Sequence, residues 1–391
     1  MQYFLILGKN PILSKAEIEA VLELKVIKYK VVKFYAQVLI LEIEEQLEIE
    51  WLNQCLGGTV KIGNILGVVK SLENFEDKFF DWVEFGNGKV FFGFSLYSLD
   101  PGGSLKKCQR QLIPVAMEIK RKLREEKHIN SRYVVSKEIE LSSVIVQKNK
   151  LLKNGAEICF FVDTKEILVG QTLAVQPFEE FGERDFGRPS RDQISGMLPP
   201  KLAKIMINLA QVNVDKTIVD PFCGSGTILQ EALLMGYQKI IGFDISDKAI
   251  NDTKNNLAWL EKNFSLKFKS LKVESLDVKD LNQRIDLDSI DAIVTEPYLG
   301  PAQKGNETPR QIQAAIKDLE KLYLVAFSQF YKVLIKGGKV VCVFPIFKID
   351  NLKLNILPEI RKMGFKLLNQ DDLIYFRPQQ LVWRDILIFE K

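Results

Sequence analysis

Short hydrophobic runs alternate with segments of helical spacing through the C-terminal half of the chain. Val214 to Asp220 is a β-branched run, and helical spacing follows it at Ile228, Leu229, Ala232 and Leu233. This order predicts an α/β unit with a doubly wound sheet. Further strands are expected at 239–246, 271–278, 289–301 and 336–347, a long amphipathic helix at 308–334, a proline-started helix at 196–211, and a closing antiparallel pair at 364–378 and 381–391.

The N-terminal half shows a different order, in which strands outnumber helices. Tyr3 to Leu22 is predicted as strand, turn and helix, with Ser14 as N-cap and Glu17 completing a capping box. Alternation at 26–44 predicts two strands. A strand (89–99), a basic helix (113–126), a strand (131–138), a Ser-capped segment (142–152) and a hairpin (156–174) follow.

Residues 220–227 read DPFCGSGT, a Gly-rich turn that leaves a strand and opens a helix. Such a turn lets the backbone approach a ligand and offers the free N–H groups of a helix N-terminus. No Gly-Lys-Ser/Thr follows, which excludes a phosphate loop, and the G-x-G-x-x-G spacing also fails. Asp220 can accept a hydrogen bond from an ammonium group, which NAD lacks and S-adenosylmethionine has. The cofactor contacts are therefore expected at Asp220, Pro221, Phe222, Gly224, Gly226 and Thr227.

Asp244 stands at the predicted tip of the second strand. An acidic residue about 20 positions beyond the glycine turn can bind ribose hydroxyls. The alternative is an N-cap of the next helix, but Ser246 fits that cap better and leaves Asp244 for ribose.

The motif D-P-F-x-G-S-G-T resembles that of the amino-methylating class I methyltransferases. This resemblance implies a Rossmann-like domain that binds S-adenosylmethionine, with Ile245 beside the ribose acid as a further cofactor residue. It also places Asp277 and the backbone of Val278 at the adenine, although Asp277 could equally be a turn residue.

The family's Asp/Asn-Pro-Pro-Tyr motif is expected after the buried strand at 289–301, where this chain reads TEPYLG. The family's carboxylate or amide accepts a hydrogen bond from an exocyclic amine, and its aromatic ring stacks on the base. We favour Glu296 as the amine acceptor, with Pro297 and Tyr298 shaping the base pocket. Alignment by the Pro-Tyr pair puts Thr295 in the acidic place instead. A proline-stopped loop with a surface glutamate remains the alternative interpretation.

Positive charge is concentrated in the predicted basic helix and the segment before it. Such a face suits a phosphate backbone, although a solvated amphipathic helix is equally compatible with it. Arg184, Arg188 and Arg191 form a second basic group, for which pairing with nearby acids is the alternative to phosphate contact. We expect RNA contacts at Lys106, Lys107, Arg110, Lys120, Arg121, Lys122, Arg124, Arg188 and Arg191.

The N-terminal arrangement, the opening LGKNPILSKAEIE and the junction at 176–192 resemble the archaeal and eukaryotic tRNA guanosine methyltransferases with THUMP domains. The resemblance implies N-terminal α+β ferredoxin-like and THUMP domains that bind tRNA, and methylation of a guanosine 2-amino group, with position 10 as the leading guess. The alternatives are amino-methylation of DNA or another RNA, and tRNA binding without catalysis. The expected divisions are 1–58 (ferredoxin-like), 59–172 (THUMP), 173–192 (linker) and 193–391 (methyltransferase).

Composition narrows the class of protein further. The chain has 391 residues, a net charge of +4, five scattered cysteines and one histidine. The cysteine pattern argues against zinc and disulfides and for a reducing cytoplasm. His128 is expected to be solvated, and no metal site is expected. No apolar run approaches about 20 residues and no signal peptide is recognised, so no membrane span is expected. A monomer or weak dimer is expected, with an activating partner protein as an option.

Overall fold

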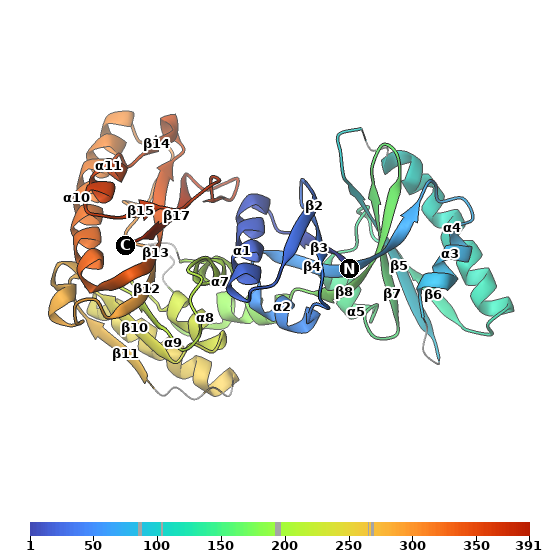
Figure 1. Cartoon of the computed structure of the whole chain (residues 1–391), viewed down its shortest axis with the longest axis horizontal. Coiled ribbons are helices and arrows are strands. Elements are labelled where there is room, and N and C mark those ends of the chain that lie inside the picture. The colour runs from blue at the N-terminus through green and yellow to red at the C-terminus, as the bar shows by residue number, and fades with distance from the viewer. Residues whose placement is uncertain (85–87, 103–104, 192–196, 265, 267–269) are drawn as a thin grey trace. The chain divides into compact units, whose positions relative to one another are not determined.

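A computed structural model describes residues 1–84, 88–102, 105–191, 197–264, 266 and 270–391. The chain divides into two compact units (Figure 1). The first contains residues 1–11, 27–54 and 59–178, and the second contains 12–26, 55–58 and 179–391. The predicted division between residues 192 and 193 lies outside the described residues. The second unit includes residues 12–26 and 55–58 from the N-terminal part of the sequence. None of the predicted divisions anticipated this.

The first unit is built on one sheet in the order β2-β3-β1-β4-β8-β7-β5-β6. β5 is parallel to β6 and β7, and the remaining pairs are antiparallel. The strands are β1 (Gln2–Leu7), β2 (Tyr29–Tyr35), β3 (Val38–Ile43), β4 (Thr59–Val69), β5 (Val90–Ser98), β6 (Ser131–Val134), β7 (Gly155–Val162) and β8 (Ile167–Val175). The helices are α2 (Ile49–Cys55), α3 (Phe75–Trp82), α4 (Leu105–Glu125) and α5 (Ser143–Lys148).

The predicted division between residues 58 and 59 falls at the start of β4. This strand pairs with β1 on one side and with β8 on the other, so one sheet runs across the division. The predicted hairpin at 156–174 is confirmed by the antiparallel pair β7 and β8. β4 itself was not recognised in the sequence. The ferredoxin-like and THUMP assignments stay predictions.

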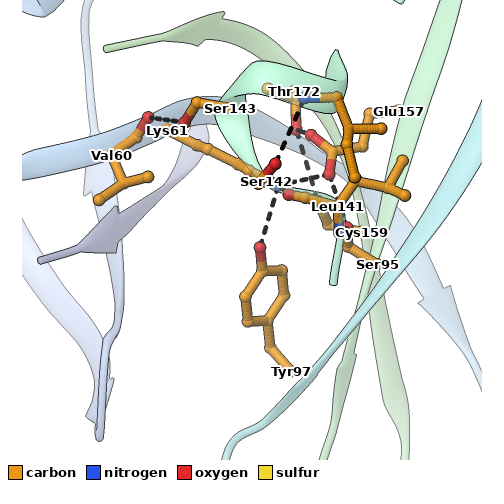
Figure 2. Close-up of polar contacts among 11 residues, drawn as sticks. Val60, Lys61, Ser95, Tyr97, Leu141, Ser142, Ser143, Glu157, Cys159 and Thr172 are labelled. Carbon is orange, nitrogen blue, oxygen red and sulfur yellow. Dashed lines mark hydrogen bonds and ion pairs between the residues drawn. The ribbon is translucent and has the colours of Figure 1, made fainter. Parts of the chain in front are cut away.

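A buried polar network joins four strands inside this sheet (Figure 2). Lys61 on β4 and Glu157 on β7 form an ion pair with side-chain exposures of 1% and 0%. Ser95 and Thr172 each donate to Glu157 at 2.6 Å, and Lys61 Nζ donates to the Leu141 carbonyl at 2.6 Å. A buried charge is tolerated when it is paired and hydrogen-bonded in this way. The network ties the segment before α5 to the sheet.

The second unit has a sheet in the order β11-β10-β9-β12-β13-β17-β15. The neighbouring pairs from β11 to β13 are parallel, and β17 is antiparallel, which confirms the α/β prediction. The strands are β9 (Thr217–Asp220), β10 (Lys239–Asp244), β11 (Ser270–Ser275), β12 (Ile290–Thr295), β13 (Leu334–Phe347), β14 (Leu352–Lys353), β15 (Lys366–Leu367), β16 (Ile374–Tyr375) and β17 (Val382–Glu390).

Side-chain alternation along the central strands separates two cores. Ile218 and Val294 belong to the core shared with α7 (Pro200–Leu209), α8 (Thr227–Leu234) and α9 (Asp247–Phe264). Val219 and Ile293 belong to the core shared with α10 (Pro309–Val333) and α11 (Leu357–Lys362). Successive residues of a strand point to opposite faces, so helices cover both faces of this sheet (Figure 1).

The capping box predicted at Ser14 and Glu17 is wrong. Helix α1 (Pro11–Leu24) begins at Pro11, because proline suits the first turn of a helix, and Ser14 lies buried within it. The Glu17 carboxylate instead accepts hydrogen bonds from the backbone N–H groups of Gly57 and Gly58 at 2.7 and 2.8 Å. Together with Leu13 and Ala20 in the α7–α8 core, these contacts make α1 a part of the second unit.

Candidate active site

The turn after β9 has the backbone that the glycine pattern predicted. Gly224 and Gly226 have φ values of 54° and 83°, in the left-handed region that glycine adopts without strain. A Cβ at Gly226 would lie 2.9 Å from Thr253 Cγ2, so the turn also packs too closely for a side chain. Thr227 then begins α8. Pro221 is buried in the turn and Phe222 is half-buried.

Asp220 ends β9 and is 1% exposed. Its Oδ1 accepts hydrogen bonds from Phe222 N at 3.1 Å and from Thr295 Oγ1 at 2.7 Å. Burial raises the pKa of this carboxyl to about 7, against the lowering effect of these two hydrogen bonds. The Thr295 contact joins the glycine turn of β9 directly to the TEPYLG turn of β12.

Asp244 ends β10 and also takes part in the glycine turn. Its Oδ2 accepts from Gly224 N at 3.0 Å, and its Oδ1 accepts from Ser246 N at 2.9 Å. Ser246 Oγ accepts from Ala249 N at 3.3 Å, which confirms Ser246 as the N-cap. Asp244 thus accepts hydrogen bonds from the backbone of the glycine turn and from the backbone at the start of α9. The sequence analysis expected its carboxylate to be available for ribose, and that contact stays a prediction. Ile245 beside it is 71% exposed.

Asp277 has the turn role that the sequence left open. Its Oδ1 accepts from Lys279 N at 3.1 Å and caps a 3-10 turn at Val278–Gln283. Its Oδ2 lies 2.9 Å from Lys279 Nζ. Val278 is buried. The adenine contacts expected at Asp277 and Val278 stay predictions.

The residues of the TEPYLG turn differ in burial and in their partners. Thr295 is fully buried and donates to Asp220, as described above. Glu296 forms an ion pair with Arg384, whose Nε lies 2.5 Å from Oε1. Pro297 is buried, whereas Tyr298 is 55% exposed. The glutamate is therefore held by the protein rather than lying on the surface as the alternative interpretation supposed.

The junction arginines divide into buried and exposed groups. Arg184 is 3% exposed and donates from Nε to Glu231 at 2.6 Å. Arg188 is also 3% exposed, and its Nη1 donates to Thr227 Oγ1 at 2.6 Å. This burial and this contact favour a structural role for Arg188, and the RNA contact expected there stays a prediction. Arg191 is exposed, with its guanidinium 5.4 Å from the Phe186 ring centroid.

Helix α4 is longer than predicted, and its cations differ in their contacts. Arg121 pairs with Glu118 and Glu125, while Lys122 pairs with Asp77 of α3. Arg124 pairs with Glu125. Among the described residues, four of the predicted cations on α4 make no ion pair: Lys106, Lys107, Arg110 and Lys120.

Two partners of the site were not predicted from the sequence. Arg384 comes from β17 and Glu231 from α8, and neither stands in a recognisable motif. No sequence pattern could have identified them, because each pairs with a residue from a distant segment.

His128 is exposed, as predicted. Among the described residues, no cluster of three potential metal ligands occurs, and no helix is long and apolar enough to cross a membrane.

Residues 188–348 match the family described as UPF0020, an RMKL-like methyltransferase domain. The tRNA (guanine(10)-N2)-dimethyltransferase of Methanocaldococcus jannaschii is 34% identical over 149 residues, which are 36% of this chain and 41% of that relative. The enzyme of the same name from Methanothermobacter thermautotrophicus is 32% identical over 180 residues, 46% of this chain and 47% of the relative. The chain thus matches less than half the length of these two relatives.

Solved structures resemble the chain over nearly its whole length. TrmN from Thermus thermophilus has a TM-score of 0.56 and 15% identity, covering 100% of both chains. SMU.472 complexed with SAH has a TM-score of 0.52 and 14% identity, covering 98% of this chain and 97% of its own. At this identity the likeness shows the fold alone.

Proposed function

We propose that this protein transfers a methyl group from S-adenosylmethionine to the exocyclic 2-amino group of a guanosine in tRNA, with position 10 as the leading candidate. The observation that carries the proposal is the hydrogen bond from Thr295 to Asp220, which joins the acidic glycine turn to the TEPYLG turn. The names of the curated relatives support the same reaction and substrate.

The residues around the glycine turn fit this cofactor. Asp220 offers a buried carboxylate to the methionine ammonium of the cofactor. The positive charge of that ammonium would favour the ionised form of Asp220, whose pKa is raised by burial in the unliganded protein. Asp244 lies at the strand tip where ribose hydroxyls bind in this fold class. The exposed Ile245 offers apolar surface to the adenine. When bound, the cofactor supplies an electrophilic methyl carbon.

The TEPYLG turn would position the acceptor base. Glu296 accepts a hydrogen bond from the guanosine 2-amino group, and the exposed Tyr298 ring stacks on the base. We assign the amine contact to Glu296 rather than to Thr295, because the Thr295 side chain is fully buried and is already bonded to Asp220. The amine nitrogen would take the methyl group, the cofactor would leave as the neutral thioether, and the proton released from the nitrogen would pass to Glu296 or to solvent. The contribution of these residues is mainly orientation.

The first unit would bind the tRNA, as a ferredoxin-like and THUMP region does in the family that the sequence resembles. The four cations of α4 that lack ion pairs within the described residues are the strongest candidates for phosphate contacts. The exposed Arg191 adds a cation in the second unit. A monomer or weak dimer, with or without an activating partner, remains part of this proposal.

The test is methyl transfer from labelled S-adenosylmethionine into unmodified tRNA transcripts, with duplex DNA in parallel, followed by nucleoside analysis. N2-methylguanosine in tRNA alone would support the proposal. Methyladenine in DNA would show that the substrate is DNA rather than tRNA. Cofactor binding without any methylated product would favour a binding protein without catalysis. Asp220→Asn should abolish the product, whereas Asp318→Asn, at a side chain that is 81% exposed, should leave it unchanged.

A further inference from the structure

Arg384 reaches the TEPYLG turn from a strand that carries no recognised motif. It lies on β17, opposite Pro345 of β13, and β13 in turn runs parallel to β12. Its side chain is 7% exposed and that of Glu296 is 13% exposed. The sheet order therefore brings a buried guanidinium to the turn that follows β12.

The two contacts between these side chains are unequal. Arg384 Nε lies 2.5 Å from Glu296 Oε1, while Nη2 lies 3.5 Å from Oε2. Charge-assisted hydrogen bonds are usually about 2.7–2.9 Å long, so the first contact is tight and the second is at the limit of a bond. One carboxylate oxygen is thus fixed, and the other retains most of its capacity to accept a hydrogen bond.

Several groups from other elements act on this carboxylate. Asp220 of β9 interacts repulsively with it, and both Asp244 and Glu296 raise the pKa of Asp220 after the larger effect of burial. Tyr323 of α10 and Cys342 of β13 also lie within its electrostatic reach. Arg384 thus supplies a positive charge to Glu296, one of three carboxylates (Asp220, Asp244 and Glu296) that interact electrostatically at this site.

We propose that Arg384 is a positioning residue that holds Glu296 Oε1 so that Oε2 faces the acceptor amine. This inference rests on the proposed methyl transfer. A glutamate has one more rotatable bond than the aspartate of the family motif, so a free side chain would sample more orientations. The planar guanidinium restrains that freedom and compensates for the longer side chain.

The test compares Arg384→Gln and Arg384→Lys with the wild type in single-turnover methyl transfer. Arg384→Gln should lower the rate constant on the order of 100-fold while the Kd for S-adenosylmethionine changes little. Arg384→Lys should restore only part of the rate, since a positive charge remains but the planar fork is lost.

Lys353→Gln provides a matched control, because it removes an ion pair to Asp385 on the same strand. It should leave the rate constant unchanged. If Arg384 were purely structural, Arg384→Gln would lower the melting temperature and weaken S-adenosylmethionine binding in step with the rate, and that result would overturn the inference.

A second measurement does not depend on activity. In the crystal structure of Arg384→Gln, the Glu296 side chain should occupy more than one orientation, whereas in the wild type and in Arg384→Lys it should keep one. A single unchanged orientation in Arg384→Gln would overturn the inference even if methyl transfer is confirmed. If the wild type makes no N2-methylguanosine, the proposed function fails, and a disordered Glu296 in Arg384→Gln would still show that Arg384 fixes its orientation.

Discussion

Asn208 Nδ2 on α7 donates to Glu17 Oε1 on α1 at 2.7 Å. Glu17 is fully buried, and its carboxylate also accepts hydrogen bonds from the N–H groups of Gly57 and Gly58. A helix near the start of the chain is thereby built into the second unit. A fragment that starts at residue 179 would lose α1 and expose the apolar face of α7 that packs with it.

The charge state of Glu17 should make folding stability depend on pH. Burial raises its pKa from 4.5 to about 7, so between these values the folded state binds a proton that the unfolded state has released. This group therefore lowers the free energy of unfolding as pH rises from about 4.5 to 7, by about 3 kcal/mol in total.

Urea unfolding at several pH values checks this expectation by comparing the wild type with Glu17→Gln. The difference between the two slopes isolates Glu17, because Asp220 contributes equally to both proteins. Glu19→Gln is the control on the same helix, since Glu19 pairs with Lys15 and is 24% exposed. Equal slopes for the wild type and Glu17→Gln would contradict the assignment.

Binding of S-adenosylmethionine should also depend on pH through Asp220. The pKa of its carboxyl is about 7 in the unliganded protein, and an ammonium ligand favours the ionised form. The affinity should therefore fall up to about tenfold for each pH unit below 7 and level off above it. Calorimetry in buffers of different ionisation enthalpy would detect the released proton. Binding by Asp220→Asn should be weaker and lack this dependence; a wild-type affinity that is flat from pH 5.5 to 8 would exclude this role.

The buried pair in the first unit should be costly to break from one side. Lys61→Met leaves the Glu157 carboxylate without its cation, and we expect a loss of about 3–5 kcal/mol in the free energy of unfolding. The double variant Lys61→Met with Glu157→Gln removes the charge and should recover a substantial part, because an amide oxygen still accepts from Ser95 or Thr172. Urea unfolding measures both, and a double variant no more stable than Lys61→Met would show that the charge is not the cause.

Substitutions of the α4 cations and of the buried junction residue Arg188 should have different effects on tRNA binding. Replacing Lys106, Lys107 or Arg110 by alanine should weaken tRNA binding and reduce the salt slope by about 1 for each phosphate that is no longer neutralised. Arg188→Ala should instead weaken cofactor binding, because the Arg188 guanidinium supports Thr227 at the start of α8. Titrations of labelled tRNA and of cofactor distinguish the two classes. A large loss of tRNA affinity in Arg188→Ala, with cofactor affinity intact, would restore its predicted RNA role.

The sequence predicted features whose causes are local. DPFCGSGT indicated the glycine turn because the backbone angles at Gly224 and Gly226 depend on the residues themselves. Alternating strands and helices predicted the parallel sheet, and Ser246 was recognised as a cap within one helical turn. Local reasoning failed at Ser14, where a capping pattern was present but the helix began at Pro11 and Glu17 bonded to distant glycines.

Only the tertiary structure decided which side chains meet. Thr295 lies 75 residues from Asp220 in the sequence, and Arg384 lies 88 residues from Glu296. The order of strands in the sheet creates both contacts, and no spacing along the chain encodes them. The same holds for the burial of Arg188, for which the sequence left RNA contact and pairing with nearby acids as alternatives. Motif residues identify a cofactor turn because its geometry is local, whereas the partners that orient and charge it depend on segments that meet only when the chain folds.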